Sequence, residues 1–213
     1  MEVAGRPLLA WSLAAFRASE TVALVVVAAP PGHEVEIERI VGEYAGTPGE
    51  PGAFHPVVVT GGDSRVASVG RALAEVPASA EVVAVHDAAR PLVTPELIEA
   101  VFDRLEASPD ATGVIAATPV ADTVKRADPD GGAIVATEPR EGLWAAQTPQ
   151  LFRAEPLRSA HDAAAADGLG ATDDAMLIEA AGGTVLIEEA RDENVKLTTR
   201  ADLRLVELLL AER

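Results

Sequence analysis

The segment from Val83 to Pro91 places three polar side chains, His86, Asp87 and Arg90, directly after a short apolar run. In an open α/β sheet, ligands bind just beyond the carboxyl ends of the strands, so these side chains would face a ligand there. A carboxylate at Asp87 can hold a divalent metal ion, and a guanidinium at Arg90 can hold phosphate oxygens. The same spacing also fits an ordinary turn with a local ion pair, and the residues alone leave both interpretations open.

Around this segment, apolar runs alternate with helical patterns along most of the chain. Strands that alternate with helices are typical of a parallel sheet with right-handed crossovers, so we predict an α/β fold in a single domain over residues 1–213. A stretch rich in glycine and proline at 47–53 predicts a loop. The predicted strands are 21–29, 55–60, 81–85, 112–117 and 184–188, and the predicted helices are 5–19, 33–44, 65–76, 95–107, 155–167, 173–181 and 200–212.

The alternation of strands and helices breaks between residues 119 and 146. Two strand patterns at 122–126 and 133–137 flank Pro129-Asp130-Gly131-Gly132, which is a strong turn pattern. An isolated hairpin is only marginally stable in water, so this one must pack on something, most simply a second subunit. We therefore predict a projecting β-hairpin arm and a homodimer joined through it.

The composition narrows the classes of ligand and location. A formal net charge of −17 argues against binding to nucleic acid or to an anionic membrane, but a small phosphorylated ligand needs only a local cluster of cations. The chain has no cysteine, which excludes disulfides and thiolate metal sites and fits a reducing cytoplasm. It also has no apolar run long enough for a membrane span, and we predict a cytoplasmic protein.

Six motifs follow one another along the chain: GGDSRVASV at 61–69, HDAARP at 86–91, DTVK at 122–125, REGLWAAQTPQ at 140–150, TDDA at 172–175 and NVKLT at 194–198. In this order and spacing they resemble the motifs of the 2-C-methyl-D-erythritol 4-phosphate cytidylyltransferase family, over nearly the whole chain. The resemblance implies a Rossmann-like, mostly parallel α/β sheet of the nucleotide-diphospho-sugar transferase type. It also implies a β-arm, at about 119–146 here, that interlocks two subunits.

The resemblance implies a reaction in isoprenoid precursor biosynthesis. CTP and 2-C-methyl-D-erythritol 4-phosphate would give the CDP-alcohol and pyrophosphate, with Mg2+ required. Such a reaction needs no covalent nucleophile, because the attacking phosphate is already an anion and the protein must only hold two anions in line. Arg90 would bind phosphate or position the loop at the end of the strand. His86 is not needed by this chemistry, and we expect it to be structural.

On the nucleotide side, the resemblance implies that Gly62, Asp63 and Ser68 contact the cytosine. Glycine lets the backbone come close to a planar base, and Ser68 or backbone groups can read the edge of that base. These residues also fit a glycine turn followed by a helix cap. The resemblance further places Asp87 near Mg2+ as a hard carboxylate ligand, with Asn194 assisting at the metal.

On the acceptor side, the resemblance implies that Lys196 positions the attacking phosphate, a task that suits a compact, mobile ammonium. Arg140 and Thr123 would reach from the arm into the neighbouring subunit's site, where Arg140 can clamp the acceptor phosphate. Thr172 and Asp173 would contact the acceptor. Without the family, Lys196 reads as a solvated salt-bridge partner, Arg140 as a surface charge, and Thr172 and Asp173 as a helix cap.

The start of the chain departs from the family. Relatives open with an apolar strand, a glycine-rich AAGxGxR loop that cradles the triphosphate, and a Pro-Lys pair, whereas residues 1–9 match the segment just after that element. We expect the gene to begin upstream. If it begins at Met1, the sheet lacks a central strand, so its neighbours expose unpaired edges and the 213-residue form is poorly stable and nearly inactive.

Three further functions stay open at this stage. A ribitol-phosphate cytidylyltransferase would share the frame and differ in its acceptor. A dimeric nucleotide-binding or sugar-phosphate-binding protein without catalysis would fit the loss of the front loop. The chain could also be one half of a bifunctional enzyme.

Overall fold

The computed structural model describes residues 1–44, 46, 55–168 and 170–212, so the loop predicted at 47–53 lies outside the described residues. Within these described residues, the strands form four separate sheets, of which the largest has the order β10–β6–β9–β5. The strands are β1 (Glu2–Val3), β2 (Arg6–Pro7), β3 (Leu24–Ala29), β4 (His55–Thr60), β5 (Val82–Val85), β6 (Gly113–Pro119), β7 (Lys125–Ala127), β8 (Ile134–Thr137), β9 (Trp144–Arg153) and β10 (Val185–Glu189).

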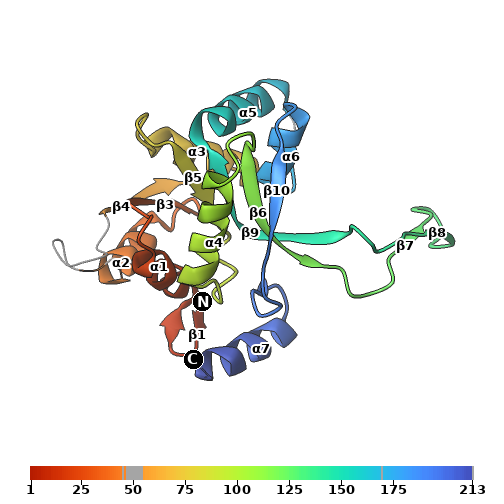
Figure 1. Ribbon diagram of the computed structural model, residues 1–213. Helices are drawn as coiled ribbons and strands as arrows, with labels where there is room; N and C mark the ends of the chain where they lie inside the picture. The colour runs from red at the N-terminus through yellow and green to blue at the C-terminus, as the bar shows by residue number, and fades with distance from the viewer. Residues whose placement is uncertain (45, 47–54, 169, 213) are drawn as a thin grey trace.

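Helices cover both faces of the largest sheet (Figure 1). On β9, Phe152 packs with side chains of α3, α5 and α6, whereas its neighbour Leu151 packs with α4 on the opposite face. Successive residues of a strand point to opposite faces, so these two side chains belong to separate hydrophobic clusters, one on each face of the sheet. The helices are α1 (Leu8–Ala18), α2 (Glu34–Tyr44), α3 (Arg65–Glu75), α4 (Pro95–Glu106), α5 (Ala154–Asp167), α6 (Asp174–Ala180) and α7 (Arg200–Ala211).

The main difference from the sequence prediction is β9, which the predicted strands did not include. It runs antiparallel between β5 and β6, while β6 pairs with β10 in parallel. Its sequence, WAAQTPQLFR, contains a proline, which is disfavoured in a central strand. The register shifts opposite this part of β9, between Ile115 and Ala117 of β6, and such irregularities are where a sheet accommodates proline.

The chain start also differs from the prediction, because helix α1 begins at Leu8 and not at residue 5. Residues 2–3 pair antiparallel with residues 6–7 to form a small hairpin. Its turn places Ala4 and Gly5 in the left-handed region of φ, at 48° and 75°. The second of these positions carries glycine, which adopts that conformation without steric cost.

A gap separates the sheet of β3 and β4 from the four-stranded sheet. β3 pairs in parallel with β4, and β5 pairs with β9; among the described residues, neither β3 nor β5 pairs with any other strand. A cavity of about 830 Å3 lies between them, lined by residues 24–28 of β3, residues 82–85 of β5, and side chains from α1, α3 and α4. Unpaired N–H and C=O groups of two strand edges therefore border one largely apolar space.

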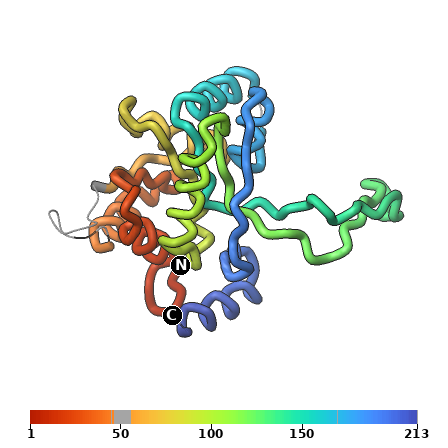
Figure 2. Tube along the Cα trace, in the orientation of Figure 1, coloured from red at the N-terminus to blue at the C-terminus, as the bar shows by residue number. Residues whose placement is uncertain are grey.

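The predicted arm is present and extends away from the body of the molecule (Figures 1 and 2). β7 and β8 pair antiparallel, and the turn between them is closed by a hydrogen bond from Asp128 N–H to the Ala133 carbonyl. Ile134 and Val135 on β8 are 65% and 60% exposed. None of the helices in the described part of the chain combines the length and hydropathy that crossing a membrane requires.

Candidate active site at the carboxyl end of β5

Asp87 lies just beyond the end of β5 and is held there by its backbone. Its N–H donates to Thr148 Oγ1 on β9 at 3.0 Å, and its carbonyl accepts from the Arg90 N–H at 2.9 Å. A turn is therefore formed at this strand end, which was one of the two interpretations that the sequence left open. One side of it is fixed to the antiparallel strand β9, which brings the REGLWAAQTPQ motif against the HDAARP motif.

His86 has a structural environment, as the sequence analysis expected. Its ring packs edge-on against Phe16, with the centroids 5.2 Å apart, and burial lowers its pKa to about 4. Thr148 Oγ1 accepts from Asp87, so the hydroxyl hydrogen is free for His86 Nδ1 at 3.0 Å. Nε2 then carries the ring hydrogen and faces the Arg90 carbonyl at 3.3 Å.

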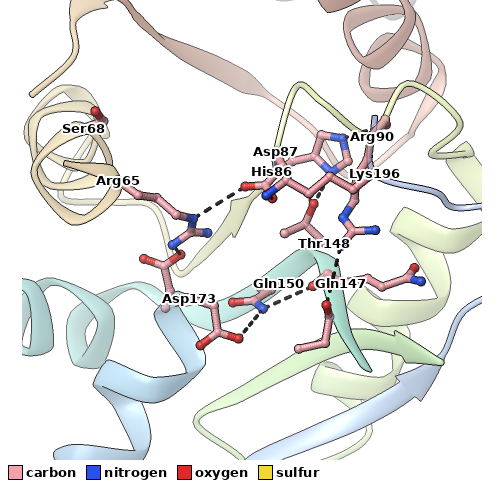
Figure 3. A network of polar contacts seen from close by, with 12 residues as sticks. Arg65, Ser68, His86, Asp87, Arg90, Gln147, Thr148, Gln150, Asp173 and Lys196 are labelled. Carbon is pink, nitrogen blue, oxygen red and sulfur yellow. Dashed lines mark hydrogen bonds and ion pairs between the residues drawn. The ribbon is translucent and has the colours of Figure 1, made fainter. Parts of the chain in front are cut away.

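The carboxylate of Asp87 lies between two cations (Figure 3). Lys196 Nζ donates to Oδ2 at 2.8 Å, and Arg65 Nε lies 3.5 Å from Oδ1. Burial by itself would raise the pKa of Asp87. The hydrogen bond to Lys196 and the charges of Lys196, Arg65 and Arg90 outweigh that effect and hold the pKa below its usual value. Asp87 is thus an anion at neutral pH.

Arg90 is buried and directs its guanidinium to backbone carbonyls. Nη1 donates to the Asn194 carbonyl at 2.8 Å, and Nη2 lies 3.5 Å from the Ala146 carbonyl. Burial lowers its pKa, and the charge of Asp87 acts in the opposite direction. With these partners, Arg90 fits the positioning of the strand-end loop better than direct contact with phosphate.

Asn194 is also buried, and it connects the last motif to β9. Its side-chain amide donates to Gln147 Oε1 at 2.8 Å and to the Thr148 carbonyl at 2.9 Å. Leu197 N–H donates to the Ala89 carbonyl at 2.7 Å. These contacts place Lys196 beside Asp87, although 109 positions separate the two residues along the chain.

The glycine turn before α3 is closed by Ser68. The Gly62 N–H donates to Ser68 Oγ at 3.0 Å, and Ser68 Oγ in turn donates to the Ser64 carbonyl at 2.9 Å. Ser64, and not Asp63, caps the helix by accepting from the Ala67 N–H. A Cβ on Gly62 would collide with that of Ala67, so close packing explains this glycine. Ser68 lines the same cavity as Arg65 and Asp87, while Asp63 is exposed.

The TDDA motif begins α6. Asp173 caps the helix, which was the alternative interpretation of this residue, by accepting from the Met176 N–H at 3.0 Å. It also accepts from Gln150 Nε2 at 3.0 Å. Thr172 is exposed. The next residue, Asp174, is fully buried and forms an ion pair with Arg65 at 2.7 Å. Arg65 and Asp174 were not predicted as site residues, although both lie inside the quoted motifs.

The arm residues are not brought to this site within one chain. Arg140 donates to the Ala121 carbonyl at 2.9 Å, which fixes it at the arm, and Lys125 donates to Thr137 Oγ1 at 2.7 Å across the hairpin. Thr123 is exposed on the same arm. The arm extends away from the body that carries Asp87 and Lys196 (Figure 2).

The sequence model of the 2-C-methyl-D-erythritol 4-phosphate cytidylyltransferase family matches residues 1–212. The chain belongs to this family. Two relatives carrying that name, from Thermosynechococcus vestitus and Parasynechococcus marenigrum, are each 42% identical over all of this chain, which covers 87% and 89% of their lengths. The predicted family and the predicted class of enzyme, a nucleotidyltransferase, are confirmed.

Solved structures agree with this assignment. The 4-diphosphocytidyl-2C-methyl-D-erythritol synthase of Anaerococcus prevotii superposes with a TM-score of 0.86 at 25% identity, covering 99% of this chain and 88% of that one. The 2-C-methyl-D-erythritol 4-phosphate cytidylyltransferase of Thermus thermophilus gives a TM-score of 0.77 at 39% identity, covering 99% and 92%. The predicted Rossmann-like α/β fold is thereby confirmed.

Proposed function

We propose that this chain transfers the cytidylyl group of CTP to 2-C-methyl-D-erythritol 4-phosphate in the cytoplasm, as a step of isoprenoid precursor biosynthesis. A phosphate oxygen of the acceptor attacks the α-phosphorus of CTP, and the bond from that phosphorus to the bridging oxygen breaks to release pyrophosphate. The observation that carries this proposal is the Asp87–Lys196 pair at the carboxyl end of β5, where α/β sheets bind their ligands.

Lys196 is the residue we propose for holding the acceptor phosphate. Its side chain is 45% exposed, so its ammonium can form further contacts with a ligand while it lies near Asp87. An ammonium is a compact point charge with three rotatable donors, which suits a phosphate that shifts during attack. Placed between two anionic reactants, it lowers the repulsion that would keep them apart. Thr172 and Asp173 would contact the same acceptor at the start of α6.

The cytosine would lie by the glycine turn, near Gly62, Asp63 and Ser68. Ser68 Oγ already bonds within the turn, so the remaining hydrogen-bonding groups of the turn backbone would read the base edge. The glycine turn directly follows β4, as Asp87 closely follows β5, and ligands of open α/β sheets bind beyond such strand ends, which supports one site for both ends of the nucleotide.

Asp87 fits the magnesium ion that the reaction requires, because its carboxylate is ionised and partly exposed. The described residues contain no group of three or more His, Cys, Asp or Glu side chains that could hold a metal. Magnesium is commonly bound by one or two carboxylates together with substrate phosphates and water, so no such group is needed. Bound there, the ion would neutralise charge on the triphosphate. Asn194 is buried and its amide donates to β9, so we propose that it supports this site and does not itself bind the metal.

We also propose that the arm completes the site of a second subunit. The exposed Ile134 and Val135 on β8 are apolar side chains that a partner would cover, and an isolated hairpin is marginal in water. Arg140 and Thr123 would then reach the partner's acceptor phosphate. The active unit would be a homodimer.

We further propose that polypeptide outside residues 1–213 supplies a strand between β3 and β5, together with the glycine-rich triphosphate loop. Two unpaired edges that face one apolar cavity support this proposal, since a strand there would pair on both sides. The chain spans 87% of the length of the Thermosynechococcus vestitus relative, which leaves room for such a segment in that protein.

Release of pyrophosphate from CTP tests the proposed activity, with methylerythritol phosphate and ribitol phosphate offered separately as acceptors. From the chain extended by the proposed strand and loop, we expect turnover with the first acceptor and a loss of about 100-fold or more on Lys196→Met. We expect no change on Arg39→Gln, an exposed residue of α2 paired with Glu43. Preference for ribitol phosphate would reassign the acceptor. Absence of turnover from the chain completed with its upstream strand and loop would overturn the proposal.

A further inference from the structure

Arg65, the first residue of α3, links Asp87 to a buried acid on another helix. Its Nη1 lies 2.7 Å from Asp174 Oδ2. Its Nε lies 3.5 Å from Asp87 Oδ1 (Figure 3). The other oxygen of Asp174 lies 2.8 Å from Nε2 of His161 on α5, whose side chain is also buried. Three helices therefore meet at one carboxylate, and Arg65 extends from it to the site.

The two cations on Asp87 are anchored very differently. Lys196 is 45% exposed, and an exposed lysine pair is held only weakly in water. Arg65 is 27% exposed and is paired with Asp174, whose side chain is completely buried. Moving Arg65 away would leave the charge of Asp174 buried without that partner, which is costly. Asp87 thus has one exchangeable partner and one fixed partner.

We infer that Arg65 is a positioning residue for the reaction, and that Asp174 acts through it. Arg65 keeps Asp87 in place when the ammonium of Lys196 turns from Asp87 to a substrate phosphate. The inference rests on the proposed function. The arrangement also explains two adjacent acids in the TDDA motif: Asp173 caps α6, while Asp174 holds Arg65.

A double-mutant cycle on Arg65 and Asp87 tests the inference, with kcat and the KM of each substrate measured separately. We expect Arg65→Gln to lower kcat by about 10-fold with little change in the KM for CTP, and Arg65→Lys to recover part of the loss. In an Asp87→Asn background, Arg65→Gln should lower kcat further by less than about 2-fold, because its effect passes through Asp87. If the fold-loss of kcat in the double variant equalled the product of the two single losses, the inference would be wrong.

Arg65→Gln leaves Asp174 without its ion pair and can fail to fold. The variant Arg65→Gln/Asp174→Asn removes both charges of the buried pair together and then replaces the single variant in the cycle. Arg39→Gln is the matched control, since it removes an arginine from an exposed ion pair on α2. Its kcat and both KM values should stay at the level of the unmodified chain.

A second measurement needs no turnover and therefore separates this inference from the proposed function. The chain has only two lysines, Lys125 and Lys196, so side-chain 13C labelling of lysine gives two sets of NMR signals, assigned with Lys196→Arg. In Arg65→Gln, or in its charge-paired replacement, we expect the Lys196 signal to shift and the Lys125 signal on the arm to stay. An unchanged Lys196 signal would show that Arg65 does not position the pair.

Discussion

The guanidinium of Arg90 donates to the backbone carbonyl of Asn194 at 2.8 Å, across 104 positions of sequence. This contact joins the loop after β5 to the segment that carries Lys196. Together with the hydrogen bond from Leu197 to Ala89, it sets the distance between the acid and the ammonium of the proposed site. The catalytic geometry thus depends on a buried arginine that need not touch a substrate.

Arg90→Met should destabilise the protein and weaken catalysis together. The variant loses a charged hydrogen bond to a buried carbonyl, a change of about 1.5–3 kcal/mol in the free energy of unfolding. Urea denaturation measures this, and pyrophosphate release measures the accompanying loss of kcat. Arg39→Gln, which breaks an exposed pair, should change stability by less than about 1 kcal/mol. If Arg90→Met kept its free energy of unfolding but lost affinity for the phosphorylated substrates, Arg90 would instead be a direct phosphate ligand.

Complementation between two inactive variants tests the shared site. If Arg140 serves the partner's Lys196, a heterodimer of Lys196→Met and Arg140→Met carries one intact site and one doubly altered site. Random pairing on co-expression should then restore about a quarter of the normal turnover per dimer. If Arg140 serves its own chain, both sites of the heterodimer are damaged and no activity returns.

Protonation of His86 should reduce stability in mild acid. Its pKa is about 4 in the folded protein against an ordinary 6.5, because burial disfavours the charged ring. The unfolded chain therefore binds the proton first as the pH falls, so stability present above pH 6.5 is lost progressively towards pH 4. The loss from this group is on the order of 3 kcal/mol.

The measurement for His86 is urea denaturation between pH 7 and pH 4 on the chain and on His86→Gln. The variant should be less stable at pH 7, since it loses part of the packing on Phe16, but its stability should fall less steeply with acid. If the free energy of unfolding fell equally steeply with pH in the two proteins, a neutral, buried His86 would be contradicted.

Filling the gap between β3 and β5 should raise both stability and turnover. An upstream extension with an apolar strand and an AAGxGxR loop would pair two free edges, and we expect the Tm to rise on the order of 10 °C. The control is the same extension with its apolar strand positions changed to serine, which should leave the Tm unchanged. Comparable turnover with and without the extension would contradict the need for this strand and loop.

The sequence by itself determined the elements whose causes are local. Helix α4 begins at Pro95 as predicted, because the hydroxyl of Thr94 and a first-turn proline both act on adjacent backbone. The arm was predicted from a turn pattern between two short strand patterns. The order of the six motifs was enough to predict the family and the enzyme class.

Only the tertiary structure decided how distant groups pair. β9 contains a proline and lacks strand alternation, and it forms a strand because β5 and β6 offer edges on both sides of it. Arg65 and Asp174 each look like an ordinary charge near a helix start, and burial between three helices makes them partners. The energy of such a pair depends on distance and solvent exclusion, which arise only when the chain is packed.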